Sequence, residues 1–549
     1  MAAASREGEV AVPGSMPERA RLRGAAAALA AVATLVALLA LLAGPAGAAE
    51  GPIAWTPCGT GAECGTLDVP LDYADPDGPT VAMPVTRVPA ADPAHRIGSL
   101  VLNYGGPGAP GAEILRDTPS EALPVLAPVV HERYDLVSFD PRGTGGTLPV
   151  DCRITAEDGL ASELVRPETL DVDALVADAR RYTGLCGERN PGVLDHVSTA
   201  DVARDMDRLR AALGEDRLTY LGYSYGTFVG ATYESLFPER QGRMVLDGAM
   251  DAANFVAHPL QDLREGAAGF ERALDRFLAA CAADQVACAG FGAAPGGGAA
   301  DPWAAFDALV ARADAEPIPA ATGDPVSGEE LVGAVTGALY AREAWPMLAV
   351  ALAQAQAGDA SIFREVLGID PYDPAAGAGN DRYIATVAVD AVWPHEVEPY
   401  LDSARQAWGL LDHMWPFAGY ENAIFAFWPA AAPAAFHGPF RSSPDAPTTL
   451  VIGTTYDPAT PYRWAVGLAG ELGNARLLTM RGDGHTAFGS RSSCIDAAVI
   501  GYLVDGAVPA PGTVCEQEVP FVQPPADQQD EAVDEGLETL ALRLRVAGR

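Results

Sequence analysis

Short apolar segments bounded by turn residues recur along this chain, and they constrain its fold more than any other feature. Segments with helical spacing separate several of them. Alternation of strand and helix patterns is typical of an α/β protein built on a mostly parallel sheet. The predicted strands are Gly65–Val69, Thr80–Val88, Gly98–Asn103, Tyr134–Phe139, Arg217–Leu221, Arg243–Leu246, Thr448–Ile452 and Ala475–Met480.

A stretch of different character separates the sixth predicted strand from the seventh. Residues 251–444 are rich in alanine and show helical spacing, with little strand pattern. The simplest interpretation is one sheet with a mainly helical cap inserted before its last two strands. The core then comprises residues 49–250 and 445–522, and residues 523–549 form an acidic tail with no assignable role.

The first 48 residues have the features of an export signal. Arginines between residues 19 and 23 precede an almost uninterrupted apolar run from Ala25 to Leu42, and Ala46-Gly47-Ala48 offers an A-x-A cleavage site. We expect a cleaved signal peptide and a secreted or cell-envelope protein. Because the run is 18 residues long, an uncleaved membrane anchor is the alternative, and contact with a membrane is expected only in that case.

The eight cysteines are an even number in a chain that we expect to be exported, which favours disulfide bonds. They form four neighbouring pairs along the sequence. Zinc binding is the alternative, but the sequence has no C-x-x-C and no nearby histidine cluster, so we expect no metal. The cysteines are Cys58, Cys64, Cys152, Cys186, Cys281, Cys288, Cys494 and Cys515.

The charge of the chain excludes several classes of function. Its formal net charge of -37 would repel a phosphate backbone, so nucleic acid is not an expected partner. All 36 basic residues are arginine, and the absence of lysine removes a P-loop lysine, a Schiff-base lysine and a Ser-Lys dyad.

One serine has the setting of a catalytic nucleophile. Ser224 is the centre of the sequence GYSYG, which follows the strand-like LTYL and precedes TFVGATYESLFPER, a segment with helical spacing. A serine on such a sharp strand-to-helix turn needs small neighbours, because larger side chains would collide with the strand and the helix. The pattern therefore favours a nucleophile elbow over an inert tight turn.

A serine nucleophile requires a base and an acid elsewhere in the chain. His485 in RGDGHTAF follows a predicted strand, and Asp457 in TTYDPATPY follows the strand before it, which gives the order Ser, Asp, His. Asp247 at the end of an earlier strand is the alternative acid, and Asp483 is too close to His485 to orient it. The histidines of second rank are His258, His395, His413 and His437.

The oxyanion that forms during such a reaction needs hydrogen-bond donors. The loop YGGPG follows the predicted strand that ends at Asn103, and its glycines leave room for a backbone N–H to face the site. We expect one donor from Gly106 and the other from Tyr225, the residue after the serine. This chemistry requires no metal or organic cofactor.

With these motifs assembled, the chain resembles the secreted tripeptidyl aminopeptidases and related serine proteases of high-GC Gram-positive bacteria, which are α/β-hydrolases with a helical cap. The resemblance implies Ser224 as nucleophile, His485 as base and Asp457 as orienting acid. It also implies cleavage near the free amino terminus of peptide substrates. The matching segments are CGTLDVPLDYADP, LVLNYGGPG, YDLVSFDPRGTGGT, LTYLGYSYGTFVGATYESLFPERQGRMVLDGAMD, TTYDPATPY and GDGHTAF.

Two features depart from that family. Its glycine loop usually continues as GGPGGSG, whereas Ala109 and Pro110 follow Gly108 here, and the cysteines that the family often carries in its cap are missing from TVAVD and FAFWP. An exopeptidase must also hold the ammonium group of its substrate. The cap offers Glu396, Glu398 and Asp390 for that purpose, without favouring one of them.

The same triad can hydrolyse esters, so a secreted esterase or lipase is the alternative activity. A non-catalytic envelope binding protein on a hydrolase scaffold is the alternative from another class. The complete set of triad residues favours an enzyme over that alternative.

Overall fold

The structure of the chain is a computed structural model. It describes residues 52–118, 128–152, 169–293, 299–321, 323–367, 374–489 and 491–522. The predicted signal peptide and the acidic tail lie outside these residues. Within them, no helix is both long enough and apolar enough to cross a membrane.

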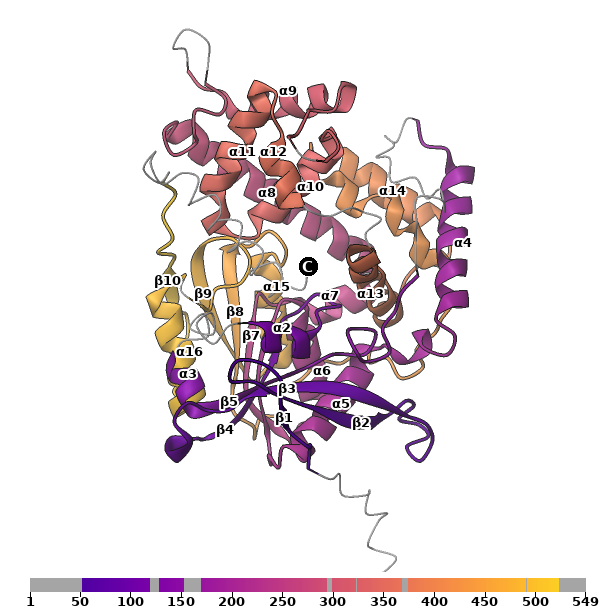
Figure 1. Ribbon diagram of the computed structural model, residues 1–549, viewed down its shortest axis with the longest axis vertical. Helices are drawn as coiled ribbons and strands as arrows, with labels where there is room; N and C mark the ends of the chain where they lie inside the picture. Colours follow the sequence, from indigo (N-terminus) through magenta and orange to yellow (C-terminus); the bar gives the residue numbers. More distant parts are fainter. Residues whose placement is uncertain are drawn as a thin grey trace, which may run out of the picture. The chain divides into compact units, whose positions relative to one another are not determined.

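A sheet of ten strands forms the centre of the fold, in the order β1-β2-β3-β5-β4-β6-β7-β8-β9-β10 (Figure 1). The first three strands and β5 pair in antiparallel fashion, and all other pairs are parallel. This sheet confirms the predicted fold class. The strands are β1 (Thr56–Pro57), β2 (Glu63–Pro70), β3 (Thr80–Val88), β4 (Gly98–Asn103), β5 (Tyr134–Phe139), β6 (Leu218–Tyr223), β7 (Gln241–Asp247), β8 (Thr449–Tyr456), β9 (Ala475–Asp483) and β10 (Val514–Glu516).

The prediction that only two strands follow the cap was wrong, because β10 pairs in parallel with β9 after them. This strand has three residues, of which only Cys515 is buried, so it presents no apolar run. A disulfide joins Cys515 to Cys494 at the start of the preceding helix. The place of β10 therefore depends on a cross-link that strand periodicity does not reveal.

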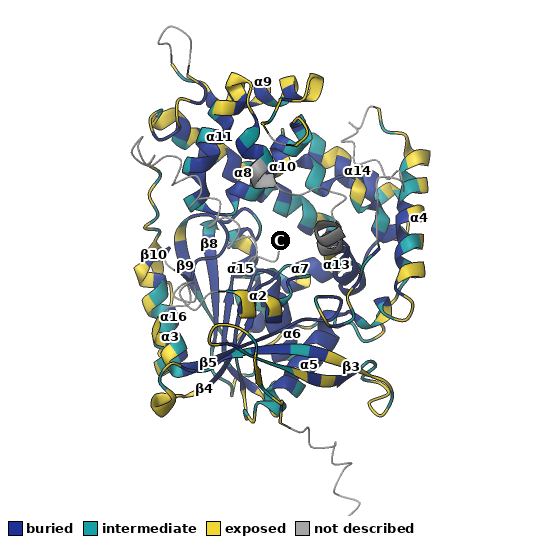
Figure 2. Ribbon diagram, viewed as in Figure 1, coloured by how far each residue is buried: buried dark blue, intermediate teal, exposed yellow. Residues whose placement is uncertain are grey.

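Helices cover both faces of the sheet, and successive side chains of β4 pack alternately against the helices on one face and on the other. Val101 packs with residues of α5, α6 and α15, whereas Leu100 and Leu102 pack with residues of α2, α3 and α16. All six residues of β4 are buried, as expected of a parallel strand covered on both faces (Figure 2). These core helices are α2 (Gly111–Asp117), α3 (Pro128–Arg133), α4 (Val172–Arg189), α5 (Thr199–Ala212), α6 (Tyr225–Leu236), α15 (Tyr462–Leu472) and α16 (Ser493–Asp505), with short 3-10 turns η1 (Pro93–His95) and η4 (Leu194–His196).

Between β7 and β8 the described residues form helices and connecting loops, with no strand and one isolated bridge between Ile318 and Val326. A separate hydrophobic cluster around Phe277 and Trp345 joins several of these cap helices. Figure 1 shows them gathered at one end of the sheet. They are α7 (Ala252–Ala257), α8 (Pro259–Ala283), α9 (Pro302–Ala315), α10 (Gly328–Leu339), η5 (Arg342–Ala344), α11 (Trp345–Ala357), α12 (Ser361–Leu367), α13 (Pro374–Asp390), α14 (Glu398–Trp408), η6 (Trp415–Ala418) and η7 (Tyr420–Phe427).

The two cap segments that lack the family's cysteines are joined by packing instead. Trp393 donates a hydrogen bond from its indole to the carbonyl of Val387 in TVAVD, at 3.0 Å. The same ring stacks on Phe425 of FAFWP with 4.0 Å between centroids. Aromatic contact therefore holds these segments together where a disulfide bond is missing.

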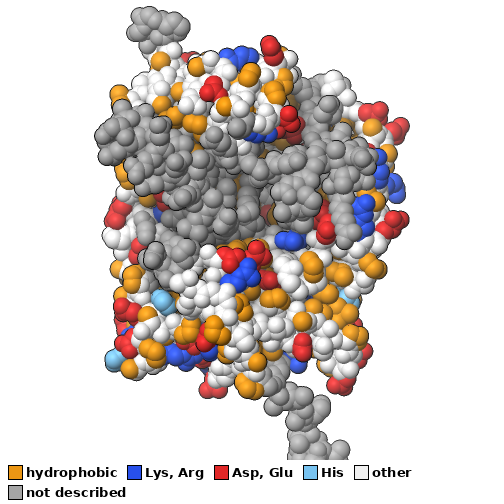
Figure 3. All heavy atoms as spheres, viewed as in Figure 1, with side chains coloured by type: hydrophobic (Ala, Val, Ile, Leu, Met, Phe, Trp, Pro, Cys, Tyr) orange, Lys and Arg blue, Asp and Glu red, His pale blue; other side chains and the backbone are white. Residues whose placement is uncertain are grey.

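All eight cysteines are paired with their neighbours in sequence, as predicted: Cys58–Cys64, Cys152–Cys186, Cys281–Cys288 and Cys494–Cys515. Four disulfide bonds are typical of a protein that works outside the cytoplasm. On the face of the molecule seen in Figure 3, the acidic and basic side chains of the described residues are interspersed.

Candidate active site

Ser224 stands alone between β6, which ends at Tyr223, and α6, which begins at Tyr225. Its backbone has φ 55° and ψ -125°, a strained conformation for a residue with a side chain. Three hydrogen bonds hold it there. The N–H of Ser224 donates to the carbonyl of Asp247 at 2.9 Å, and the carbonyl of Ser224 accepts from the N–H of Thr227 at 2.8 Å and from its hydroxyl at 2.6 Å. This is the strand-to-helix turn that the sequence predicts.

Close backbone approaches explain the glycines around the serine. A Cβ on Gly222, in β6, would lie 2.4 Å from the carbonyl oxygen of Gly226, the second residue of α6. A Cβ on Gly105 would lie 2.7 Å from the carbonyl oxygen of Tyr223 and 3.0 Å from Cβ of Ser224. Larger residues at either position would push the strand, the helix or the glycine loop away from the serine.

The glycine loop after β4 therefore lies directly against the elbow. Its Gly105 donates a backbone hydrogen bond to Oδ1 of Asn103 at 2.9 Å, and Gly106 has a φ of +104° that side chains rarely adopt. Tyr225 is the first residue of α6, where backbone N–H groups have no partner within the helix and carry its positive end. The fold thus brings the loop of Gly106 to the two residues Ser224 and Tyr225.

His485 and Asp457 are hydrogen-bonded to each other in the buried interior. Nδ1 of His485 lies 2.9 Å from Oδ1 and 3.0 Å from Oδ2 of Asp457, and the residues are 3% and 0% exposed. Nδ1 of the ring is therefore engaged by the carboxylate. Among the described residues, Nε2 has no hydrogen-bond partner. This arrangement leaves Nε2 as the ring atom available to a further group.

Backbone N–H groups fix the carboxylate of Asp457. Oδ1 accepts from Ala459 at 3.0 Å and from Thr460 at 2.8 Å, and Oδ2 accepts from Thr486 at 3.3 Å. These three bonds hold both oxygens of the carboxylate in a fixed orientation. The Asp-Pro turn after β8 thus both aims the carboxylate and supplies the donors that satisfy it.

Asp247, the alternative acid, has a different set of partners. Its carboxylate accepts from the backbone N–H of Ala487 at 3.0 Å and of Phe488 at 2.8 Å, whereas its own carbonyl accepts from Ser224. Burial raises its pKa to about 6. It therefore joins the elbow to the backbone that follows His485, a role that sequence reasoning missed because main-chain donors leave no sequence pattern.

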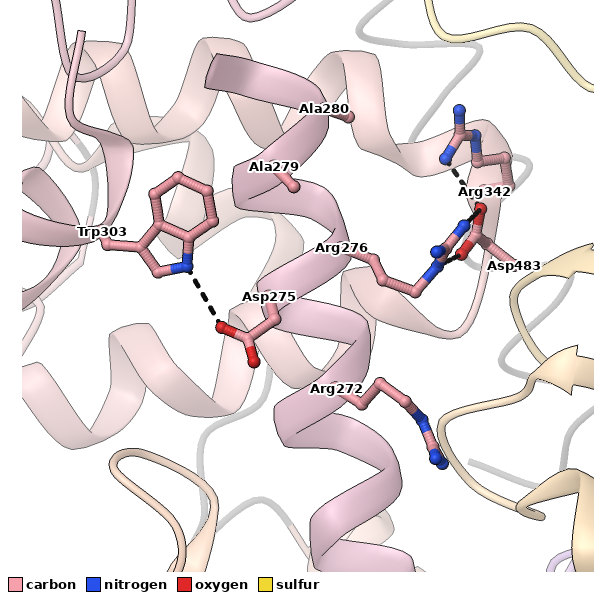
Figure 4. Close-up of a pocket in the computed structure, with 8 residues that line it drawn as sticks. All are labelled: Arg272, Asp275, Arg276, Ala279, Ala280, Trp303, Arg342 and Asp483. Carbon is pink, nitrogen blue, oxygen red and sulfur yellow. Dashed lines mark hydrogen bonds and ion pairs between the residues drawn. The ribbon is translucent and has the colours of Figure 1, made fainter. Parts of the chain in front are cut away.

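Asp483, excluded as the orienting acid because it lies too close to His485 in sequence, pairs with arginines of the cap. Arg276 of α8 and Arg342 of η5 both bind its carboxylate, the latter at 3.0 Å (Figure 4). These residues line a pocket of about 600 Å³, together with Arg272, Asp275 and Trp303. None of the predicted triad residues lines this pocket.

The four histidines of second rank have other surroundings than His485. His413 bridges Glu271 at 3.2 Å and Asp307 at 2.9 Å within the cap. The other three are exposed: His258, His395 and His437.

The acids considered for the substrate ammonium have different surroundings. Glu396 and Glu398 are exposed, and Glu398 pairs with Arg405 at 2.7 Å. Asp390 is buried and accepts from the N–H and the hydroxyl of Thr199, at 2.9 and 2.6 Å. Because the Thr199 hydroxyl also bonds to the hydroxyl of Tyr225, Asp390 ties the end of α13 to the elbow.

Comparison with protein families gives two matches. Residues 98–287 match the model of the alpha/beta hydrolase fold. Residues 417–515 match the model described as TAP-like protein. Together they span both parts of the sheet on either side of the cap.

Curated relatives match most of the chain. Serine protease Hip1 of Mycobacterium tuberculosis is 35% identical over 498 residues, which cover 84% of this chain and 91% of the relative. Tripeptidyl aminopeptidase of Streptomyces coelicolor is 32% identical, with 85% and 86% covered. Carboxylesterase B of Mycobacterium tuberculosis is 33% identical, with 83% and 86% covered.

Solved structures are more distant. Esterase E22 is similar at 14% identity with a TM-score of 0.33, and 81% of this chain and 100% of that chain are covered. The identity and coverage of the curated relatives decide the assignment. The chain belongs to the tripeptidyl aminopeptidase-like family of α/β-hydrolases, and it is a serine hydrolase.

Proposed function

We propose that this chain is a secreted serine peptidase that releases short peptides from the free amino termini of peptide substrates. The observation that carries the proposal is the buried hydrogen bond between Nδ1 of His485 and Asp457. This bond leaves Nε2 without a hydrogen-bond partner among the described residues, so it is available to act as the base. The loop that carries His485 is also joined to Ser224 through Asp247, which accepts from Ala487 by its carboxylate and from Ser224 by its carbonyl. The names of the two peptidase relatives support the substrate class.

In the proposed mechanism, Nε2 of His485 takes the proton of Ser224 as its Oγ attacks the scissile carbonyl. The N–H groups of Gly106 and Tyr225 bind the oxyanion that develops. The imidazolium then protonates the leaving amine, which departs as the shortened peptide. Water hydrolyses the acyl-enzyme in a second cycle of the same proton transfers.

Asp457 keeps the proton of the neutral imidazole on Nδ1 and stabilises the imidazolium once it forms. No step requires a metal or an organic cofactor. The group that binds the substrate ammonium is left unassigned, because Glu396 and Glu398 are exposed and Asp390 is engaged by Thr199.

Paired substrates test the proposal. The wild-type chain should hydrolyse a tripeptide p-nitroanilide with a free amine and should lose most activity on its N-acetylated form. Replacement Ser224→Ala should abolish both activities while the circular dichroism spectrum stays unchanged. Equal rates on the free and acetylated substrates would remove the aminopeptidase assignment, and full activity of the variant would remove the mechanism.

An ester hydrolase is the second candidate, because one relative is named a carboxylesterase. Turnover of p-nitrophenyl acyl esters without measurable hydrolysis of any free-amine peptide anilide would favour this candidate. A chain that hydrolyses neither class and does not react with a fluorophosphonate would be a binding protein.

Export is part of the proposal, since the disulfide bonds favour an oxidising compartment. Sequencing the amino terminus of the mature chain tests it. A start close to Ala49 supports a cleaved signal peptide, whereas a start before Ala25 contradicts it.

A further inference from the structure

The segment between β9 and α16, here called the histidine loop, carries His485 and is held by the cap. The backbone N–H of His485 donates to the carbonyl of Tyr340 at 2.7 Å. The ring of Tyr340 meets the imidazole edge to face, with 5.4 Å between centroids and 89° between planes. Both the backbone and the ring of the predicted base therefore contact one cap residue.

Ion pairs flank these contacts on both sides. Before His485, Asp483 pairs with Arg342 of the cap at 3.0 Å (Figure 4). After it, Arg491 pairs with Glu343, with 3.0 Å from Nε to Oε1 and 3.1 Å from Nη2 to Oε2. Tyr340 and Glu343 thus contact the histidine loop, and Arg342 contacts the last residue of β9 just before it.

Arg491 reaches back to the main chain of the base itself. Its Nη1 donates to the carbonyl of His485 and, at 2.9 Å, to the carbonyl of Thr486. Thr486 has a φ of +64°, which a β-branched residue rarely adopts without support. The guanidinium therefore clamps the two peptide units that follow the Cα atom of His485, the first of which adjoins it.

The burial of Arg491 makes a general role in stability a poor explanation. The residue is 1% exposed, and a charge moved out of water is costly unless geometry and hydrogen bonds are excellent. A planar guanidinium can bind two carbonyls and a carboxylate at once, which a smaller or neutral side chain cannot do. The arrangement is suited to holding the backbone of His485 and Thr486 in one conformation.

We propose that Arg491 and Glu343 are positioning residues for His485, and that the cap segment Tyr340–Glu343 sets the catalytic geometry through them. The inference rests on the proposed role of His485 as the base. It adds that the cap, besides shaping access to the site, holds the base in place. Arg491 acts through the backbone of His485 and Thr486, without touching the substrate.

Three variants test this proposal: Arg491→Met, Arg491→Lys and Glu343→Gln. Because Nε2 must stay aligned with Ser224, we expect kcat to fall about 10- to 100-fold in Arg491→Met, with KM within about twofold of wild type. Arg491→Lys should recover part of that loss, since its ammonium keeps the charge and one set of donors. Glu343→Gln should lower kcat about 3- to 10-fold, because a neutral amide anchors the guanidinium less firmly.

Arg481→Met is the matched control, because Arg481 lies on β9 close in sequence but forms an exposed ion pair with Glu516. It should leave kcat and KM unchanged. A double variant, Glu343→Gln with Arg491→Lys, should lose less than the product of the two single losses if both act as one unit. If Arg491→Met does not fold, Glu343→Gln and the double variant decide the outcome.

His485→Ala separates this inference from the proposed function. If that variant keeps its activity, the proposed function fails. If it is inactive while the folded Arg491 and Glu343 variants keep kcat within twofold, the positioning role fails alone. A rise in KM that matches the fall in kcat/KM, with kcat unchanged, also overturns the positioning role, because it indicates damage to binding.

Discussion

The ends of β7 and β8 make an instructive comparison. These neighbouring parallel strands lead to two aspartates, Asp247 and Asp457, and both are completely buried. Both carboxylates bind the histidine loop, but Asp457 contacts the imidazole of His485 whereas Asp247 contacts only backbone N–H groups after it. Similar acids in similar positions thus have different partners, and we expect them to differ in function for that reason.

The two carboxylates also differ in their sets of partners. Burial raises the pKa of Asp247 to about 6, and the N–H groups of Ala487 and Phe488 only partly offset that effect. Asp457 has three backbone donors and an imidazole as partners. In the proposed mechanism Asp457 therefore orients the base, whereas Asp247 supports the loop that carries it.

The largest expected effect is that of Asp457→Asn. An amide can turn its NH2 toward Nδ1 and hold the histidine in the wrong tautomer, so kcat should fall about 10³- to 10⁴-fold with the fold intact. Steady-state kinetics on a free-amine tripeptide anilide measures this. A fall in kcat of less than about tenfold would contradict the contrast between Asp457 and Asp247, because the imidazole would then not depend on Asp457.

The pH dependence of stability gives the next largest effect. The pKa of Asp247 is raised from 3.8 to about 6 in the folded chain, so its contribution to stability is complete below about pH 4 and is lost as the pH rises through 6. The loss amounts to about 3 kcal/mol for a fully buried group.

Denaturant unfolding of wild type and Asp247→Asn at several pH values measures this loss. Between pH 4 and pH 6 the unfolding free energy of wild type should fall relative to that of the variant. Above pH 7 the difference between the two should stay constant. Parallel curves for the two proteins would show that Asp247 does not titrate in this range.

A smaller effect is expected on catalysis by the same variant. Asp247→Asn leaves one carbonyl oxygen where two carboxylate oxygens now accept from Ala487 and Phe488. The loop should loosen, and kcat should fall about 10- to 50-fold with little change in KM. If kcat falls as far as in Asp457→Asn, the two acids have equivalent roles and the comparison fails.

The smallest effect should come from Glu234→Gln. Glu234 lies buried in α6, the helix that follows the serine, and burial raises its pKa to about 8. It is therefore already neutral at pH 7, where it accepts a hydrogen bond from the hydroxyl of Thr449 at 2.8 Å. A neutral amide should keep kcat within about twofold. A tenfold loss would mean that any buried acid near the elbow matters, and that the contrast between Asp247 and Asp457 is not specific.

Much of the sheet can be predicted from the sequence, because its strands are buried apolar runs between turn residues. The bounds of β3, β4 and β5 agree with prediction, whereas β6 continues to Tyr223 beyond its apolar run. The two-residue β1 was missed because it is too short for a periodic signal.

The candidate site was predictable only where chemistry has a local pattern. The elbow at Ser224 has such a pattern, and chain order correctly favoured Asp457 over Asp247 as the partner of His485. The pair Arg491 and Glu343 has no such pattern, because the two residues are 148 positions apart. Arg491 also binds backbone carbonyl groups, which leave no trace in the sequence. Nor could the sequence tell that Glu396 and Glu398 face solvent, since the cap is acidic on many faces.

Fluorophosphonate labelling followed by mass spectrometry tests the central claim most directly. The chain has no lysine, so trypsin cleaves it only after arginine and releases residues 218–240, between Arg217 and Arg240, as one peptide. We expect one label per chain, located on Ser224, and none in Ser224→Ala. A label on Ser235 of the same peptide or on any other residue, or hydrolysis by a chain that stays unlabelled, would contradict the account.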